Sequence, residues 1–267
     1  MVKKRIIFTL LYDGEGYFVL SRNFRLQKIG DLHWLKKQYN FAKVSFFIDE
    51  LIILDVSRKT RSLESIVSVL QAISKECFIP ISVGGGIYSV DQARELFRSG
   101  ADKVVINSCL LDETTTMVSD LAEEFGSQSI LGCLDLKRHT AEDRYDIFIG
   151  NGSEQTEISI TDAFSYLAEV GIGELYLNSI DRDGTGTGLD FEMLNLLPKE
   201  WPIPIILGGG IGNRDHFVKG LRHDLVDAVA TANLLNFVGD GLRDARTHSI
   251  ACGINLAKWP SLSSVAL

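Results

Sequence analysis

The sequence has few cysteines, and none of them is arranged as part of a metal site. They are scattered along the chain: Cys77, Cys109, Cys133 and Cys252. They form no Cys-x-x-Cys pair and have no histidine at ligand spacing, which is typical of reduced thiols in a cytosolic protein. No run approaches the roughly 18 apolar residues that span a membrane, and the apolar stretch near the N-terminus is too short for a signal peptide. We therefore expect a cytoplasmic protein without a metal, a membrane span or a signal peptide.

Positive charge is also scarce. Lys and Arg number 27 against 35 Asp and Glu, a formal net charge of −8. This balance argues against a broad surface for nucleic acid, which needs many cations to neutralise phosphates. Anions can still bind locally, through backbone amides and helix N-termini. The shares of apolar residues (45%) and charged residues (23%) are those of an ordinary globular protein. We expect no cofactor.

Short apolar runs alternate with amphipathic segments along the chain. Continuously apolar strands are buried on both faces, which indicates a parallel sheet covered by helices. Eight such units predict a single closed (β/α)8 TIM barrel rather than an open, doubly wound sheet. A capping-type Ser89 also predicts a helix over Asp91–Arg98. The predicted strands are Arg5–Leu11, Glu50–Val56, Ile79–Val83, Lys103–Ile106, Ser129–Leu136, Glu174–Asn178, Pro204–Leu207 and Ala228–Ala230.

An internal repeat supports the barrel. Pro80 aligns with Pro204 at an offset of 124 residues, and the same offset aligns Glu50 with Glu174. A period of this length indicates two half-barrels of four βα units each, and we assign residues 1–252 to the barrel. The polar stretch His139–Glu157 is interpreted as a loop excursion after the fifth strand. Residues 253–267 lie outside the pattern and are expected to form a partly disordered tail.

Two triple-glycine turns each follow an apolar strand and precede a helix. These turns, Gly84–Gly86 and Gly208–Gly210, are related by the same offset. Glycine allows the backbone to approach a ligand closely, so successive amides can point at a phosphate. Two symmetric turns therefore predict a substrate with two phosphate-like ends. The alternative is that the glycines only form tight turns.

Acidic residues follow the fifth and sixth predicted strands. Asp135 ends an apolar run, and a carboxylate at the C-terminal end of a barrel strand faces the mouth where active sites lie. Asp181 and Asp183 follow the sixth strand in the segment DRDGTG. These side chains are candidates for general acid or base catalysis. Each has a structural alternative, a loop cap for Asp135 and a solvated turn for the other two.

Charged residues also begin four of the predicted strands, at the opposite end of the barrel. Opposite charges on neighbouring strand starts would form a ring of ion pairs. From the residues alone, this ring is best interpreted as a stabilising device. Its members are Arg5, Glu50, Lys103 and Glu174.

Taken together, these segments resemble the cyclase subunit of imidazole glycerol phosphate synthase over residues 3–245. The similarity rests on DELIILDV, IPISVGGGI, GADKVVINS, ELYLNSIDRDGTGTGLD and IPIILGGGIGN. It implies a heterodimer with a glutaminase, whose ammonia passes through the barrel to a bisphosphorylated, ribulosyl-type substrate. It further implies catalysis by Asp135 and Asp183, an ammonia gate at the charge ring and a partner contact at Asp102. The implied phosphate-binding residues are Gly85, Gly86, Asn107, Gly184, Gly209, Gly210 and Thr231.

The sequence departs from that family at the first strand. The family's catalytic aspartate falls at Leu11, and its nearby lysine falls at Leu20, with Arg22 close by. Asp13 is not expected to replace the lost acid. Leucine at this point is similar to a branch associated with surface glycans, including lipopolysaccharide. In that branch, ammonia helps to amidate an acetamido group of a phosphorylated or nucleotide-linked sugar.

We expect the chain to belong to the surface-glycan branch, as the ammonia-using synthase subunit of a glutamine amidotransferase. The alternatives are the cyclase of histidine biosynthesis itself, the related isomerase built on the same half-barrels, and a non-catalytic activator of a glutaminase. The isomerase requires a base on the first strand, and Leu11 speaks against it. The activator would keep Asp102 and the charge ring while losing the chemistry of the first half.

Overall fold

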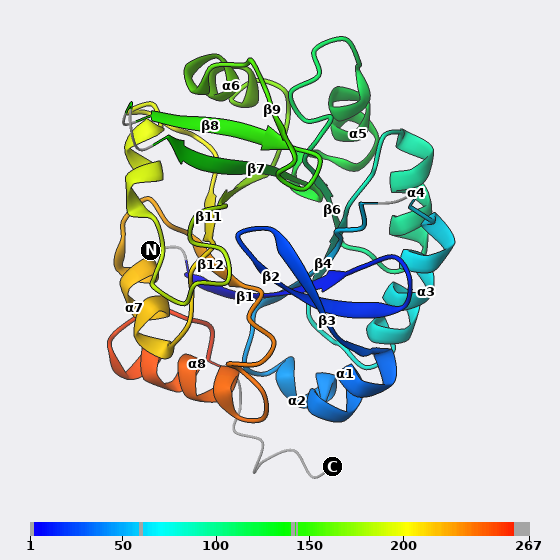
Figure 1. Ribbon diagram of the computed structural model, residues 1–267, viewed down its shortest axis with the longest axis vertical. Coiled ribbons are helices and arrows are strands. Elements are labelled where there is room, and N and C mark those ends of the chain that lie inside the picture. Colours follow the sequence, from blue (N-terminus) through cyan, green and yellow to red (C-terminus); the bar gives the residue numbers. More distant parts are fainter. Residues whose placement is uncertain (1–2, 59–60, 140–141, 143, 259–267) are drawn as a thin grey trace.

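The computed structural model describes residues 3–58, 61–139, 142 and 144–258. Eight parallel strands stand side by side in a ring that Figure 1 shows end-on. The last strand of the ring pairs in parallel with the first, so the sheet is closed and the predicted (β/α)8 barrel is confirmed. In order around the ring, the strands are β1 (Arg5–Tyr12), β4 (Glu50–Asp55), β5 (Ile81–Gly84), β6 (Lys103–Ile106), β7 (Ile130–His139), β10 (Glu174–Ser179), β11 (Ile205–Gly208) and β12 (Ala228–Thr231).

Helices cover the outside of the ring (Figure 1). The predicted helix Asp91–Arg98 lies within α4, where the Ser89 side chain accepts the N–H of Gln92. The helices are α1 (Leu32–Gln38), α2 (Phe41–Val44), α3 (Leu63–Ser74), α4 (Val90–Arg98), α5 (Met117–Phe125), α6 (Ile160–Leu167), α7 (Arg214–Arg222) and α8 (Gly241–Ala251). Short 3-10 turns are found at Ser127–Ser129 and, after β10, at Phe191–Leu196. Among the described residues, no helix is both long and apolar enough to span a membrane.

The apolar residues form two layers. One cluster fills the inside of the barrel and includes Ile7, Ile52 and Ile206, while a larger cluster lies between the sheet and the helices. Burial on both faces explains why the strands are continuously apolar. The chain beyond α8 packs against the rest of the protein as far as Ala257, with Ile254 and Leu256 buried and the carbonyl oxygen of Ala257 accepting a hydrogen bond from Arg246. The rest of the predicted tail, residues 259–267, lies outside the described residues.

The structure contains the repeat and adds two hairpins that sequence reasoning missed. After β1, the strands β2 (Tyr17–Arg22) and β3 (Arg25–Asp31) form the first hairpin. After β7, the strands β8 (Arg144–Ile149) and β9 (Glu154–Gln155) form the second, within the stretch that was interpreted as an excursion after the fifth strand. The excursion is a paired hairpin, because β8 pairs with an extension of β7 beyond the barrel rim.

The pairing of the two hairpins shows which residues occupy equivalent positions in the two half-barrels. Leu11 pairs with Val19 on the first hairpin, and Asp135 pairs with Phe148 on the second. Leu11 and Asp135 are 124 residues apart, the offset of the repeat. They therefore occupy equivalent positions, one in each half-barrel.

The first glycine turn is packed against the end of the neighbouring strand. Gly85 has φ +104°, and a Cβ added there would overlap the carbonyl oxygen of Asp55. The turn therefore requires glycine here for packing, whether or not a ligand binds. Gly16 offers a matched case, because its φ is +108° but an added Cβ would have no atom within 4 Å.

We expect Gly85→Ala to destabilise the protein by about 2 kcal/mol more than Gly16→Ala, because only the first substitution adds a steric overlap to the backbone strain. Chemical unfolding of both variants and the wild type measures this difference. Equal losses of stability would show that the approach to Asp55 is not a constraint.

Candidate functional site

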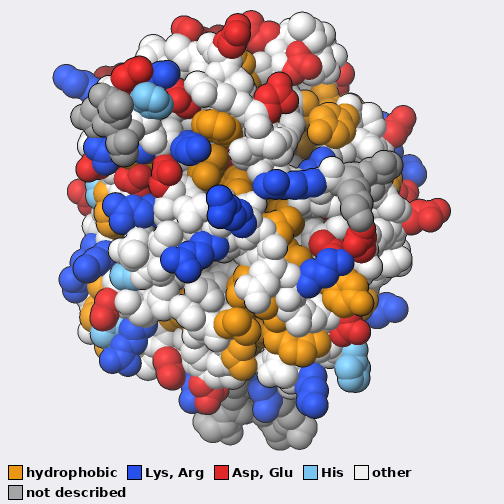
Figure 2. All heavy atoms as spheres, in the orientation of Figure 1, with side chains coloured by type: hydrophobic (Ala, Val, Ile, Leu, Met, Phe, Trp, Pro, Cys, Tyr) orange, Lys and Arg blue, Asp and Glu red, His pale blue; other side chains and the backbone are white. Residues whose placement is uncertain are grey.

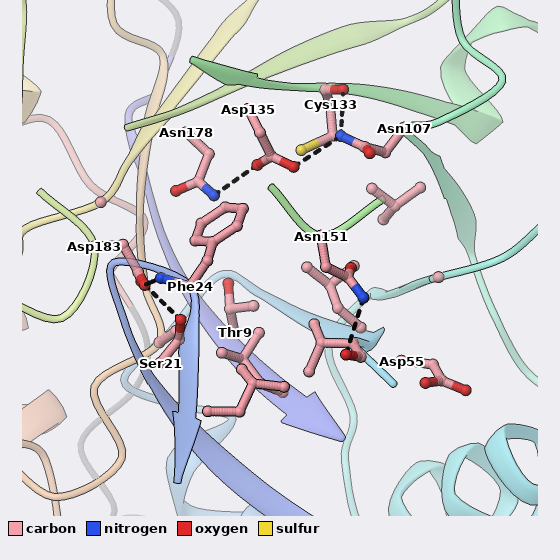
Figure 3. A pocket seen from close by; sticks show the side chains of 18 of the residues that line it. Thr9, Ser21, Phe24, Asp55, Asn107, Cys133, Asp135, Asn151, Asn178 and Asp183 are labelled. Atoms are coloured by element: carbon pink, nitrogen blue, oxygen red, sulfur yellow. Dashed lines mark hydrogen bonds between the residues drawn. The ribbon is translucent and has the colours of Figure 1, made fainter. Parts of the chain in front are cut away.

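A cavity of about 250 Å³ opens at the C-terminal mouth of the barrel. It brings together, from both halves of the chain, the nine residues that the resemblance assigns to catalysis or phosphate binding. Figure 3 shows the labelled members converging on this space. The nine are Asp135, Asp183, Gly85, Gly86, Asn107, Gly184, Gly209, Gly210 and Thr231. Asp181, the other candidate acid, does not line the cavity and instead accepts the N–H of Arg138 at 2.7 Å.

Asp135 lies on β7 near the centre of the pocket and is held by two amides. Asn107 Nδ2 donates to one carboxylate oxygen at 3.1 Å, and Asn178 Nδ2 donates to the other at 2.9 Å. Asn107 also donates to the carbonyl oxygen of Cys133 at 3.0 Å, which fixes its amide. Asn178 faces Asp135 in the register of β10 on β7. The carboxylate is therefore oriented from both sides (Figure 3).

Burial raises the pKa of Asp135 to about 7, because the charged form loses its hydration. The hydrogen bonds from Asn178 and Asn107 oppose this shift, and the nearby charge of Asp183 adds to it. A carboxyl group with a pKa near neutrality can both hold and release a proton under ordinary conditions. This is the property that general acid–base catalysis needs.

Asp183 lies in the loop after β10 and is bound by the first hairpin. Ser21 Oγ donates to Asp183 Oδ2 at 2.5 Å, and the N–H of Phe24 donates to the same oxygen at 3.0 Å. Burial raises the pKa of Asp183, while the bonds from Ser21 and Phe24 oppose that rise. The two aspartates therefore sit in one pocket with different hydrogen-bond partners.

The two hairpins meet over the mouth. The turn of the first contains Asn23 and Phe24, both with positive φ (49° and 61°). A Cβ added at Gly184 would overlap the backbone of Ser21, so glycine is required where this hairpin approaches the β10 loop. A Cβ added at Gly152, on the second hairpin, would overlap the Phe24 ring. Gly184, predicted from resemblance to bind phosphate, thus has a packing role as well.

Leu11 lines the pocket at the position equivalent to Asp135, together with Leu20 and Arg22. Asp13 does not line it. Its carboxylate pairs with Lys28 Nζ at 2.9 Å and accepts the N–H groups of Glu15 and Tyr17. These contacts hold the Asp13 carboxylate outside the pocket.

Sequence reasoning assigned no role to four other side chains of the pocket. One of them, Asp55, gave a usable signal, because it ends an apolar strand just as Asp135 does. Asn178 ends the predicted sixth strand, and its pairing with Asp135 depends on the strand register, which the sequence does not show. Ser21 and Arg61 gave no signal, because their contacts join segments that only the fold brings together. All four line the cavity: Asp55, Asn178, Ser21 and Arg61.

The strand-start charges form the predicted ring at the other end of the barrel. Arg5 pairs with Glu50 at 3.1 Å and with Glu174 at 2.6 Å. Lys103 pairs with the same two residues at 3.1 and 2.9 Å. Burial opposes the charges of Arg5 and Glu174, but their pairing outweighs it, so the pKa of Arg5 is raised and that of Glu174 is lowered.

Asp102 is exposed just before β6, at the same end of the barrel as this ring. Its Oδ2 accepts the N–H of Ile81 at 2.8 Å, so the side chain also caps the start of β5. This bond is a structural reason for an aspartate here that the sequence did not reveal.

The fold and the site together define a class of protein. It is a (β/α)8 barrel whose mouth holds a buried carboxyl group of raised pKa and two glycine turns. Among the described residues, no three His, Cys, Asp or Glu side chains are grouped to hold a metal ion. The chemistry available to these residues is proton transfer and the binding of a polar or anionic molecule.

Comparisons with known proteins agree with this class. The family model described as "Histidine biosynthesis protein" matches residues 25–239. "Putative imidazole glycerol phosphate synthase subunit hisF2" of Parasynechococcus marenigrum is 46% identical over all of this chain and 98% of that protein. Imidazole glycerol phosphate synthase subunit HisF of Chlorobium limicola is 35% identical over 93% of this chain and 96% of its own. The corresponding protein of Chlorobaculum tepidum is 34% identical over 96% and 99%. The chain therefore belongs to the histidine biosynthesis protein family, in which it is a HisF-like cyclase subunit.

The raised pKa of Asp135 predicts a pH-dependent stability. In the unfolded chain this carboxyl titrates near 3.8, whereas in the folded protein it keeps its proton to about 7. Between these values the folded state binds more protons than the unfolded state. The stability of the wild type relative to Asp135→Asn should therefore fall as the pH rises from about 4 to about 7. Chemical unfolding at several pH values tests this, and a constant difference would contradict it.

Proposed function

We propose that the chain is the ammonia-using synthase subunit of a glutamine amidotransferase and that its acceptor is the acetamido group of a sugar in surface-glycan biosynthesis. A glutaminase partner releases the ammonia. The sugar is phosphorylated or linked to a nucleotide. The observation that carries the proposal is Leu11, an apolar side chain at the position equivalent to Asp135.

A leucine at this position removes proton transfer from one side of the pocket. Acid–base chemistry that requires a carboxylate in each half-barrel is therefore disfavoured, because leucine neither accepts nor donates a proton. The pocket keeps Asp135 and Asp183 on the side of the second half. The greater identity to the hisF2 protein (46%) than to the HisF proteins (34–35%) supports a branch distinct from those.

In the proposed reaction, the carbonyl carbon of the acetamido group forms a bond to the ammonia nitrogen and its oxygen leaves as water, after two protons lost by the nitrogen have been transferred to that oxygen in turn. Asp135 donates a proton to the departing oxygen, which its raised pKa allows near neutral pH. Asp183 accepts a proton from the incoming nitrogen. Backbone amides at Gly85 and Gly86 hold one phosphate-like group of the acceptor, and those at Gly209 and Gly210 can hold a second.

The charge ring is proposed as the gate through which ammonia enters, and Asp102 as a contact with the glutaminase. Both lie at the N-terminal ends of the strands, opposite the pocket. Four ion pairs close this end, and Glu50 is almost fully buried beneath them, with a further bond from Ser82 Oγ at 2.6 Å. Passage of ammonia then requires a transient opening of at least one of these pairs.

The second candidate is the cyclase of histidine biosynthesis. The names of the HisF relatives favour it, because they describe subunits of imidazole glycerol phosphate synthase. The two candidates share the glutaminase, the ammonia and the two aspartates, and they differ only in the acceptor.

The acceptor is identified by incubating the chain and its glutaminase with glutamine labelled in the amide nitrogen. One reaction receives a nucleotide-linked acetamido sugar, and the other receives the bisphosphorylated ribulosyl-type substrate. We expect label in the sugar, found by mass spectrometry. Label only in an imidazole product would establish the histidine role, and no product from either would reject both.

In the productive reaction, Asp135→Asn and Asp183→Asn should each lower turnover by about 100-fold or more, because each removes a proton-transfer group. Asp13→Asn is the matched control, since this carboxylate pairs with Lys28 outside the pocket. Equal activity of wild type and Asp135→Asn would contradict the assigned role.

We expect Lys103→Met to lower glutamine-dependent turnover more than turnover supported by added ammonium salt. Lys103 closes the ring through Glu50 and Glu174, whereas ammonia supplied in bulk solution can reach the pocket from its open mouth. An equal decrease in both activities would indicate that the ring is only structural.

A further inference from the structure

Four arginines surround the mouth of the pocket, although the chain carries a net charge of −8. Arg22 and Arg25 flank the turn of the first hairpin, and Arg58 and Arg61 lie between β4 and α3. Arg22, Arg25 and Arg61 line the cavity, and Arg58 donates to the carbonyl oxygen of Phe24 at 2.9 Å. Figure 2 shows Lys and Arg side chains gathered over this face. We call these four residues the basic collar.

Arg61 differs from the rest of the collar in its contacts. Its side chain lies against Gly86 of the first glycine turn, in the space that a Cβ would occupy. Its Nε is buried and has no hydrogen-bond partner among the described residues. Asp55 Oδ1 is 3.9 Å from this nitrogen, too far for a hydrogen bond, and already accepts the N–H of Ser57 at 2.9 Å. Pairing with Asp55 therefore does not satisfy Arg61.

A buried guanidinium N–H without an acceptor is unfavourable, and a ligand oxygen placed there removes the penalty. The guanidinium presents its N–H groups in a planar fork that fits two oxygens of a phosphoryl group. Deeper in the cavity there are no arginines, and the lining combines apolar side chains such as Leu11, Leu54 and Val105 with the carboxyl groups of Asp135 and Asp183, which disfavour a second anionic group there. The charge distribution therefore suits a molecule with an anionic end at the collar and a neutral part inside.

The second glycine turn lacks this arrangement. Arg182 contacts Gly210 through its Cβ, but its guanidinium donates to Thr187 Oγ1 at 3.3 Å and does not line the cavity. The two turns are thus equivalent in backbone position and different in charge. A ligand with one strongly anionic group therefore binds with that group at the first turn, where the arginine lies, and not at the second.

We propose that Arg61 binds a phosphoryl group of the acceptor against the turn at Gly85 and Gly86, and so fixes which end of the acceptor faces the first half-barrel. The identity of this ligand as the acceptor rests on the proposed function. The binding of a phosphoryl group at Arg61 does not, and it is measured without turnover.

The test uses inorganic phosphate and pyrophosphate at low ionic strength, with binding followed by calorimetry and by the rise in Tm. We expect Arg61→Gln to weaken binding by about 10-fold or more, the effect of losing a charge-assisted hydrogen bond. Arg61→Lys should be intermediate, because it keeps the charge without the fork. Arg182→Gln is the matched control and should bind as the wild type does.

Unchanged binding by Arg61→Gln, or an equal loss in Arg182→Gln, would overturn the proposal. A crystal structure of the wild type with phosphate gives a second test that does not depend on how the variants fold. A phosphate oxygen within hydrogen-bonding distance of Arg61 Nε supports the assignment, and phosphate at the second turn alone contradicts it. If phosphate binds at Arg61 but neither acceptor is labelled, the proposed function fails and the Arg61 site stands.

Discussion

The parallel pairing of β1 with both β4 and β12 closes the sheet, and the rest of the molecule depends on that closure. In a closed parallel barrel all strands end at the same rim, so side chains that are far apart in sequence share one cavity. Asp135 and Asn178 are register partners on neighbouring strands, and Asn107 directly follows the strand on the other side of Asp135, so the three side chains meet at the rim. An open sheet would separate β1 from β12 and leave the pocket without one wall.

The repeat gives the two half-barrels equivalent backbone positions, and the side chains at these positions have diverged. Leu11 and Asp135 have the same backbone environment, each followed by a hairpin that pairs with the strand carrying it. One position is apolar, and the other has a carboxyl group with a pKa near 7. The glycine turns diverge in the same way, since the first has a guanidinium in the pocket and the second does not. The asymmetry of the site therefore resides in side chains and not in the backbone.

Much of the fold could be predicted from the sequence, because buried parallel strands leave continuous apolar runs with polar residues at their ends. All eight barrel strands and the partners in the charge ring followed from this pattern. The hairpin β2–β3 did not, because its residues are largely exposed and its turn, Asn23–Phe24, has no glycine to indicate positive φ. The contact of Ser21 with Asp183 could not be predicted either, since it joins residues 162 apart.

The first hairpin also has a consequence for the order in which molecules reach the site. Its tip occupies Asp183 Oδ2 through Ser21 and Phe24, so any molecule that bonds to that oxygen competes with the hairpin. Each such bond contributes about 0.5–3 kcal/mol, which is small enough to be exchanged for contacts with an incoming ligand. The strained turn lowers the cost of release further. Occupancy of this carboxylate oxygen by a ligand and the position of the hairpin tip over the mouth are therefore thermodynamically linked.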